Sequence, residues 1–323
     1  MKVLRQVAAR YAVSITQAVR DTIKTANDPI ALQYVPQAAE LVITPEELND
    51  PIGDEPHSPV KGIIHRYPDR ALLTPVKVCA VYCRFCFRRE QVGPGQKILS
   101  AAELESALDY IRAHNEIYEV ILSGGDPLIL KPEKLKALIT ALSAIEHVQV
   151  IRIHTRIPVA DPQRITDAMG DALQTSKALY IAIHTNHKQE LSTLAQEAFA
   201  RLIKYGCTLV SQTVLLRGVN DNAQALEDLF RRLLALRVKP YYLHHPDLAT
   251  GTSHFRLSIA EGQAIFKQLR GRLSGLALPT YVLDIPGGYG KVPISASYVQ
   301  CDEAGNTYVT DPQGHTHLYP PLS

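Results

Sequence analysis

The sequence lacks any long apolar run, and this absence excludes several classes of protein. No stretch approaches the roughly 20 consecutive apolar residues that a membrane-spanning helix needs. Residues 1–20 also lack the continuous apolar core of a secretory signal peptide. We therefore expect no membrane partner and no secretion, and we interpret the basic start of the chain as the first helix of the fold rather than as a transit peptide.

An excess of charge of one sign is also missing. The chain has 34 Lys and Arg residues against 32 Asp and Glu residues, a formal net charge of +2. This balance gives no electrostatic reason to expect a nucleic-acid or membrane-surface partner. With 323 residues, 46% of them hydrophobic, the chain is long enough for one large domain with a well-buried core.

Cysteines are few, and their number is odd. Three of the five cluster, so a disulfide framework is not expected and a reducing, cytoplasmic compartment is favoured. The other two, Cys207 and Cys301, stand alone in the sequence. We expect both to be small buried apolar residues rather than ligands.

Short β-rich runs alternate with amphipathic helical stretches after a helical segment (1–45) and a Pro/Gly-rich loop (49–62). This order predicts an α/β fold with a parallel sheet, of the partial (β/α)6 barrel type. It also predicts an N-terminal helical extension (1–60), a barrel core (61–275) and a C-terminal segment (276–323) with a hairpin turning at Gly305-Asn306. The β-rich runs cover residues 70–78, 118–126, 148–156, 178–186, 207–216 and 239–245, with a seventh at 280–291.

The polar residues of interest follow these runs. In such barrels the chemistry collects at the C-terminal ends of the strands. The clustered cysteines follow the first run, and His184, Asp247 and Asp284 come at or after the ends of later ones. We therefore expect these side chains on one rim of the barrel.

The segment CAVYCRFCFRR, residues 79–89, places Cys79, Cys83 and Cys86 together without a fourth cysteine nearby. A structural zinc site usually takes four ligands in two pairs, and no second pair is present. A thioredoxin-type pair would use only Cys83 and Cys86. Three thiolates suit a [4Fe-4S] cluster in which one iron keeps no protein ligand and can bind a substrate or a second cofactor.

The spacing C-x3-C-x2-C after a first β-run, with an aromatic residue before the third cysteine, resembles the signature of the radical S-adenosylmethionine (SAM) superfamily. The resemblance implies that SAM binds the iron that has no protein ligand. It also implies that a Gly-Gly-acid motif at the second strand end holds the amino group of SAM. Taken alone, this motif would suit a tight strand–helix turn. The matching residues are Ser123, Gly124, Gly125 and Asp126, and His184 and Gln212 match further polar positions around SAM.

Six segments narrow the resemblance to the lysine 2,3-aminomutase family, over about residues 55–300. They are HRYPDRALL, CAVYCRFCFRR, LSGGDPL, LLRGVNDN, KPYYLHHPDLATGTSHFR and LDIPGGYGKVP. The resemblance implies an isomerase that uses a 5′-deoxyadenosyl radical and pyridoxal 5′-phosphate (PLP) to move the α-amino group of L-lysine to C3. It also implies an electron donor such as flavodoxin or ferredoxin.

The resemblance assigns Lys291 as the residue that bonds covalently to PLP, and Arg66 and Tyr67 as the phosphate-binding pair. An amine at the end of a glycine-rich turn can reach an aldehyde, and arginine offers a planar fork for phosphate oxygens. Without the family, Lys291 would be a solvated turn residue and Arg66 an anchor for its loop. Tyr289 replaces a glycine common in the family, so the turn must accommodate it.

For the substrate, the resemblance assigns Arg88 to the carboxylate and Asp247 with Asp284 to the distal ammonium. Two carboxylates on neighbouring strand ends make a site for a cation, so lysine is favoured over acidic amino acids. Each acid could instead cap a helix or pair with a base, and a strand-end histidine could be hydrogen-bonded core.

Several alternatives stay open at this stage. The substrate could be another amino acid such as arginine, or a protein-bound residue. The chain could also consume SAM on another substrate, or be a non-catalytic iron–sulfur regulator or electron carrier. Some segments resemble the family branch that supplies β-lysine for elongation factor P. Asn222 replaces a cysteine of longer members, so no zinc-bridged subunit interface is expected and a homo-oligomer stays possible.

Overall fold

A nine-stranded sheet in the order β1 to β9 forms the centre of the protein. The computed structural model describes residues 2–93, 95 and 98–320. Strands β2 to β8 are parallel, while β1 and β9 pair antiparallel at the two edges. The strands are β1 Ile63–Tyr67, β2 Arg70–Val76, β3 Glu119–Gly124, β4 Val150–Thr155, β5 Ala178–His184, β6 Thr208–Val214, β7 Lys239–His244, β8 Thr280–Ile285 and β9 Gly290–Pro293.

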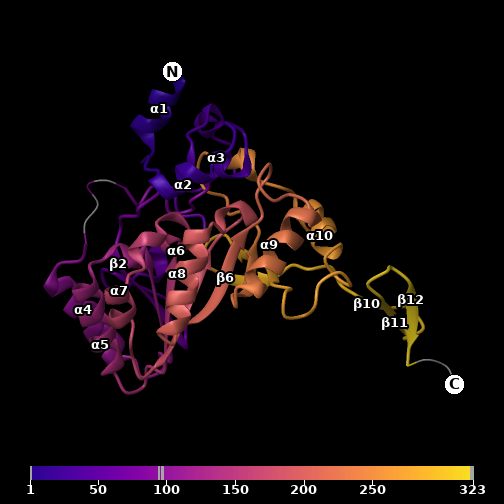
Figure 1. Ribbon diagram of the computed structural model, residues 1–323. Helices are drawn as coiled ribbons and strands as arrows, with labels where there is room; N and C mark the ends of the chain where they lie inside the picture. Colours follow the sequence, from indigo (N-terminus) through magenta and orange to yellow (C-terminus); the bar gives the residue numbers. More distant parts are fainter. Residues whose placement is uncertain (1, 94, 96–97, 321–323) are drawn as a thin grey trace.

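Helices cover the outside of this sheet, as Figure 1 shows, so that the main apolar core lies between the two layers. The connecting helices are α4 Ala101–Ala113, α5 Pro132–Ser143, α6 Ile157–Ala160, α7 Asp167–Ala172, α8 Thr193–Lys204, α9 Ala223–Ala235 and α10 Ile259–Lys267. The 3-10 turns are η1 Ala38–Leu41, η2 Glu55–His57, η3 Pro127–Ile129, η4 Pro162–Arg164, η5 Lys188–Glu190 and η6 Ser253–Phe255.

The capping signals in the sequence explain where helices begin. The Ser100 hydroxyl accepts the Glu103 backbone N–H at 3.2 Å, and the Glu103 carboxylate accepts the Ser100 N–H at 2.8 Å. This capping box satisfies two backbone donors that the first turn of α4 leaves free. On the inner face of α4, Ala107, Leu108 and Ile111 are buried against the sheet.

The six expected β-runs are confirmed as β2 to β7. The seventh run, 280–291, divides into β8 and the start of β9, because Gly287, Gly288 and Gly290 adopt positive φ and reverse the chain. Strand β1 was not predicted, since HRYPDR gives no alternating pattern. Together the parallel strands form the nearly closed α/β barrel that the sequence predicted.

The two edge strands approach each other and nearly close the barrel. The backbone N–H of Lys291 on β9 donates a hydrogen bond to the Tyr67 hydroxyl on β1 at 2.8 Å. The barrel opening therefore lies beside the turn that carries Lys291.

The N-terminal helices α1 Lys2–Arg10, α2 Gln17–Thr22 and α3 Pro29–Tyr34 lie together over one end of the barrel (Figure 1). They contact η1, α6 and η5, of which α6 and η5 follow barrel strands directly. The N-terminal segment thus covers the rim formed by the carboxyl ends of the strands. Whether residues 1–60, 61–275 and 276–323 behave as separate domains stays a prediction.

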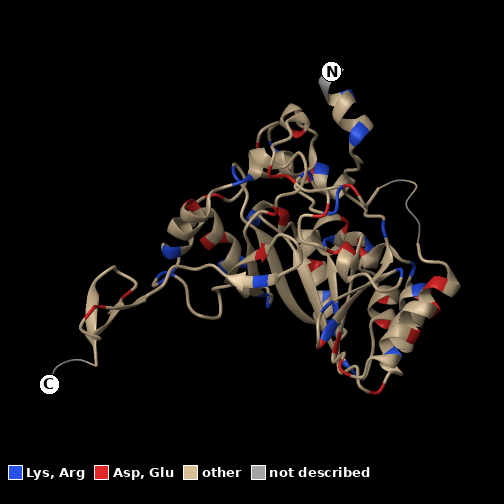
Figure 2. Cartoon of the chain, turned by 180° about the vertical axis from the view of Figure 1, so that it is seen from behind, with Lys and Arg blue, Asp and Glu red and all other residues tan. Residues whose placement is uncertain are grey.

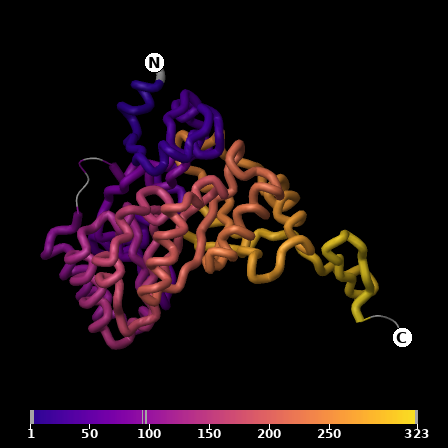
Figure 3. The backbone as a smooth tube through the Cα atoms, viewed as in Figure 1, coloured from indigo at the N-terminus to yellow at the C-terminus, as the bar shows by residue number. Residues whose placement is uncertain are grey.

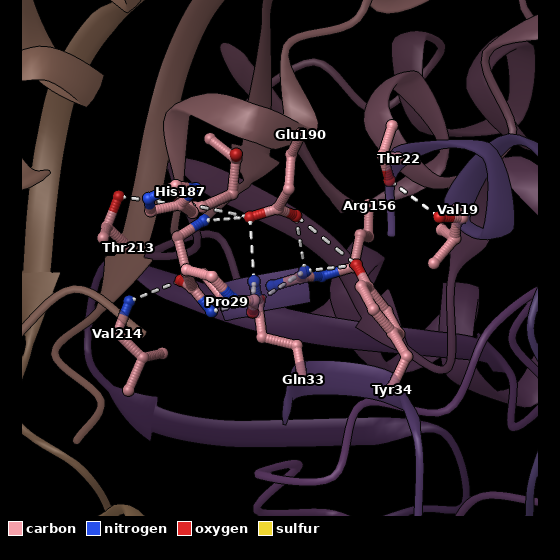
Figure 4. Close-up of polar contacts among 12 residues, drawn as sticks. Val19, Thr22, Pro29, Gln33, Tyr34, Arg156, His187, Glu190, Thr213 and Val214 are labelled. Carbon is pink, nitrogen blue, oxygen red and sulfur yellow. Dashed lines mark hydrogen bonds and ion pairs between the residues drawn. The ribbon is translucent and has the colours of Figure 1, made fainter. Parts of the chain in front are cut away.

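A buried polar network ties this cover to the barrel (Figure 4). Glu190, only 3% exposed, accepts from the Arg156 guanidinium at 2.9 Å and from the Gln33 side chain at 3.3 Å. Its carboxylate also accepts the backbone N–H groups of Asn186 and His187 at 2.7 and 2.9 Å. One acid therefore joins α3 to the ends of β4 and β5.

We expect Glu190→Gln to lower the free energy of unfolding by about 3–5 kcal/mol, because it leaves the buried Arg156 guanidinium without a counter-ion. Urea unfolding monitored by circular dichroism measures the loss. Glu46→Gln is the matched control: Glu46 pairs with Arg256 but its side chain is 53% exposed, so its loss is expected to cost less than about 1 kcal/mol. Equal unfolding midpoints for the two variants would contradict the role of Glu190.

The C-terminal residues form a separate antiparallel sheet of β10 Val299–Cys301, β11 Thr307–Thr310 and β12 Thr316–Tyr319. Figures 1 and 3 show it projecting away from the barrel. The predicted hairpin is confirmed, with Gly305 at φ 86° in the turn between β10 and β11. Cys207 is buried as expected, but the prediction for Cys301 was wrong: it is exposed because β10 lies outside the main core.

Lys and Arg residues are interspersed with Asp and Glu residues along the outer helices (Figure 2). Among the helices in the described ranges, none combines the length and the apolar character needed to cross a bilayer.

Candidate active site

A cavity of about 630 Å³ opens at the carboxyl ends of the parallel strands. Every residue that the sequence nominated lines this one cavity. The set comprises Cys79, Cys83, Cys86, Arg88, Arg66, Tyr67, Ser123, Gly124, Gly125, Asp126, His184, Gln212, Asp247, Asp284 and Lys291. Most of these residues meet because they end or follow neighbouring parallel strands, whereas Arg66 and Tyr67 come from β1 and Lys291 from β9, the two antiparallel edge strands.

The three cysteines lie on the loop that follows β2, and none forms a disulfide. Burial raises the pKa of each thiol, to about 11 for Cys83. All three thiols line the same cavity. Three soft thiol donors on one cavity wall fit an iron–sulfur cluster.

In the described ranges, no three Cys, His, Asp or Glu side chains form a group compact enough to hold one metal ion. A cubane cluster would place each thiolate on a different iron, so this finding does not bear against the cluster.

The Ser123–Asp126 segment ends β3 beside this loop. A Cβ at Gly125 would lie 2.4 Å from the Val78 carbonyl oxygen, so glycine is required for packing against the cysteine-bearing strand end. The Asp126 carboxylate accepts the Thr155 hydroxyl and the Arg156 N–H, both at 2.7 Å. This segment therefore acts first as a tight turn that joins β2, β3 and β4, with its backbone facing the cavity.

Two neutral histidines face the cavity from adjacent strands, with ring centroids 5.7 Å apart. Burial lowers the pKa of His184 to about 3, and burial also holds the pKa of His154 well below its usual value. The Nε2 atoms of both rings are buried and have no protein partner in the described ranges. Gln212 lies beside His184 in the parallel register of β5 and β6. These polar atoms are available to a bound ligand.

The Lys291 amine enters the same cavity from β9. It forms an ion pair with Asp284 on β8 and lies 3.4 Å from Nδ1 of His244 on β7. Tyr289, whose side chain is 82% exposed, points outward and is accommodated without positive φ, because the neighbouring glycines supply it. An amine directed into a cavity lined with arginines fits a PLP site.

The two aspartates that the resemblance assigns to the substrate differ in charge state. Burial, and then the charge of Asp284, raise the pKa of Asp247 to about 7. Although burial opposes it, the hydrogen bond with His244 and the charge of Lys291 hold the pKa of Asp284 well below its usual value. At neutral pH, Asp284 is ionised and Asp247 is close to half ionised.

Arg66 and Arg88 also line the site, and both donate to Asp54. Asp54 was missed in the sequence because it lies in the Pro/Gly-rich loop at 49–62, which was interpreted only as a connection. Its partner Arg88 lies 34 positions away, so no local spacing reveals the pair. The only available signal was an acid beside Gly53 in that loop.

His244 and a buried arginine pair were also missed. Glu40, fully buried, binds Arg84 through Nε and Nη2 and also pairs with Arg89, both of which flank Cys86 in the sequence. Through this ion group, the two arginines of the cysteine loop are bound to Glu40 in the N-terminal segment, which ties the loop to the N-terminal cover.

The comparisons with known proteins agree with this geometry. The sequence profile of the radical SAM superfamily matches residues 73–232, and a profile described as lysine-2,3-aminomutase matches residues 266–320. A radical SAM methyltransferase from Sphaerobacter thermophilus shares the fold, with a TM-score of 0.50 and 20% identity over 68% of each chain.

Curated relatives cover most of the chain. A putative L-lysine 2,3-aminomutase of Aquifex aeolicus is 43% identical over 84% of this chain and 74% of its own length. The L-lysine 2,3-aminomutase of Methanococcus maripaludis is 42% identical over 90% and 67%, respectively. A glutamate 2,3-aminomutase of Clostridioides difficile is 40% identical over 84% and 64%. The chain therefore belongs to the lysine 2,3-aminomutase family of radical SAM enzymes and is an isomerase.

Proposed function

We propose that this isomerase depends on PLP and moves the α-amino group of L-lysine to C3, giving β-lysine. The observation that carries the proposal is the pair Asp247 and Asp284 in the cavity that also holds the Lys291 amine and the three cysteines. A substrate held there would have its distal ammonium beside two carboxylates.

The acidic pair favours binding of lysine over binding of amino acids with an acidic side chain. Two carboxylates attract an ammonium group and repel a side-chain carboxylate such as that of glutamate. Arginine also carries a distal cation, so it is the alternative that charge alone does not reject. The relative that acts on glutamate shows that the family's substrates differ, and the acidic pair argues against glutamate here.

Each nominated residue has a task in this proposal. The thiolates of Cys79, Cys83 and Cys86 would hold the cluster, and Lys291 would hold PLP, with Arg66 and Tyr67 at its phosphate. Arg88 would bind the α-carboxylate. When bound, SAM on the cluster supplies a carbon radical that removes hydrogen from C3, and PLP holds the nitrogen in a form that can migrate.

The remaining residues shape the space around the reaction. Ser123, Gly124, Gly125, Asp126, His184 and Gln212 would bind SAM, the last two through neutral polar atoms. The N-terminal cover lies over the rim, and shielding of this rim from water would protect a reactive radical from side reactions. His244 lies beside Lys291 and is neutral, since burial lowers its pKa to about 4, so its Nδ1 can accept a hydrogen bond from the lysine amine.

The proposal also includes an electron donor and a cellular compartment. A low-potential donor such as flavodoxin or ferredoxin would reduce the cluster. The free cysteines support a reducing, cytoplasmic compartment.

We expect the KM for lysine to fall as the pH rises from 6 to 7.5 and to level off above about 8. Below its pKa of about 7, Asp247 is neutral and attracts the substrate ammonium less, so KM should rise up to about tenfold per pH unit. Steady-state kinetics across this range measure the effect. Asp247→Asn should have a high KM with a flat profile, and an unchanged slope in that variant would contradict the assignment.

The experiment that tests the function is anaerobic incubation of the reconstituted protein with SAM, PLP, dithionite and a mixture of the common amino acids. We expect β-lysine as the main isomer, with SAM regenerated. Stoichiometric 5′-deoxyadenosine without an isomer would indicate an enzyme that consumes SAM. An isomer of arginine or glutamate would overturn the choice of substrate, and no PLP absorbance with no product would favour a regulator or electron carrier.

A further inference from the structure

One carboxylate lies between the two arginines assigned to the two anionic groups of the site. Asp54 Oδ1 accepts from Arg66 Nη2 at 3.0 Å. Asp54 Oδ2 accepts from Arg88 Nε at 3.0 Å and from Arg88 Nη2 at 2.8 Å. The side chains of Asp54, Arg66 and Arg88 are 5%, 11% and 9% exposed, and all three line the cavity.

The contacts of Arg88 leave a usable edge. A guanidinium has five N–H donors, and Arg88 uses three of them, two on Asp54 and one from Nη1 on the Ser123 hydroxyl at 3.2 Å. The two remaining donors are on the two terminal nitrogens. This pair of nitrogens binds a carboxylate in the bidentate mode. Asp54 therefore binds the edge of the guanidinium formed by Nε and Nη2. The edge formed by Nη1 and Nη2 is left for a ligand.

The loop that carries Asp54 is fixed at both ends. The Asp50 carboxylate accepts the Asp54 and Glu55 backbone N–H groups, both at 2.8 Å. Gly53 packs on the turn before Lys291, where a Cβ would lie 2.4 Å from the Gly288 nitrogen. Asp54 is thus held at a fixed position relative to both the arginines and the PLP-lysine turn.

The charges of the three side chains do not cancel. Two guanidinium groups and one carboxylate leave a net charge of +1 in a buried space. A buried arginine without a counter-ion is costly, so Asp54 stabilises the pair before any ligand arrives.

We propose that Asp54 is a positioning residue shared by the two anion sites. It orients Arg66 toward the phosphate of PLP and Arg88 toward the α-carboxylate of the substrate, and it thereby couples the two sites. This inference rests on the proposed function, since it takes the roles of both arginines from there.

The test uses Asp54→Asn in the full chain reconstituted with its cluster. PLP affinity is measured by absorbance, with pyridoxal as the analogue without phosphate. Binding of lysine and of lysinamide, which lacks the carboxylate, is then read from the shift of the PLP absorbance without a reductant. We expect the preference for PLP over pyridoxal, and that for lysine over lysinamide, each to fall roughly tenfold or more, the size of a lost charge-assisted contact.

The matched control is Glu227→Gln on α9. Glu227 is also a carboxylate between two arginines, 3.0 Å from Arg231 Nε and 2.6 Å from Arg272 Nη2, but it does not line the cavity. Both preferences should be unchanged in this variant, and iron content should match the wild type in both variants. Asp54→Ser, a smaller neutral replacement, is used if Asp54→Asn does not fold.

Unchanged preferences in Asp54→Asn, or equal losses for lysine and lysinamide, would overturn the proposal. Loss of the fold and of iron in both Asp54 variants would assign Asp54 a purely structural role and overturn it as well. Failure of the proposed function has a different signature: the wild type would then bind no PLP or would not prefer lysine over lysinamide.

Discussion

Replacement of Cys83 by serine is expected to remove the iron from the protein and to reduce activity to background, a loss of at least about 10⁶-fold. Cys83 is the middle residue of the three cysteines on the cavity wall. A serine hydroxyl is a hard and very weakly acidic donor that does not replace a thiolate on iron. In the proposed function the cluster would supply the electron that cleaves SAM, so a protein without the cluster would form no radical.

Iron and sulfide analysis and the absorbance of the anaerobically reconstituted protein measure this loss. Cys301→Ser is the control, because Cys301 is exposed on β10 and does not line the cavity. It should keep both iron and activity. A Cys83→Ser protein with a full iron content would show that the cluster has other ligands, and the assignment of the three cysteines would be wrong.

Replacement of Lys291 by alanine is expected to abolish the PLP chromophore and the activity while leaving the iron content unchanged. Lys291 supplies the amine that would hold PLP, and it also neutralises Asp284. Its loss removes the covalent attachment and places two carboxylates, Asp284 and Asp247, in one cavity without a nearby ammonium. The pKa of Asp247 should then rise further, since like charges disfavour ionisation.

Absorbance after gel filtration measures retained PLP, and iron analysis shows whether the cluster site is intact. The control is Lys61→Ala, whose side chain is 63% exposed and pairs with Glu103 outside the cavity. That variant should keep PLP and activity. A Lys291→Ala protein that turns over lysine at the normal rate would show that PLP is not attached at this position.

The central strands could be predicted from the sequence because each is a short buried run in a repeating β/α order. Their partners follow from the order alone, since neighbouring parallel strands are consecutive in the chain. The edges could not be predicted in this way. Strand β1 contains His65, Arg66 and Tyr67 in a row, and it is a strand because it pairs with β2. Cys301 was misjudged for a related reason, because nothing local shows that β10 lies outside the main core.

The residues of the candidate site also differ in whether a local sequence signal reveals them. The cysteines could be nominated from their spacing, whereas the glycine turn and Lys291 were assigned through the resemblance to the family. Asp54, Glu40 and Glu190 act through partners far away in the sequence, and each lies in a segment of ordinary composition. Only the fold shows that these acids neutralise arginines around the site.

The hydrogen bond between the Lys291 N–H and the Tyr67 hydroxyl joins the first and last strands of the main sheet at the residue proposed to carry PLP. A displacement of the Lys291 side chain would therefore be transmitted to the junction between β1 and β9, the two edge strands at which the barrel nearly closes. Hydrogen–deuterium exchange at the Lys291 amide would then report how often β1 and β9 separate during turnover.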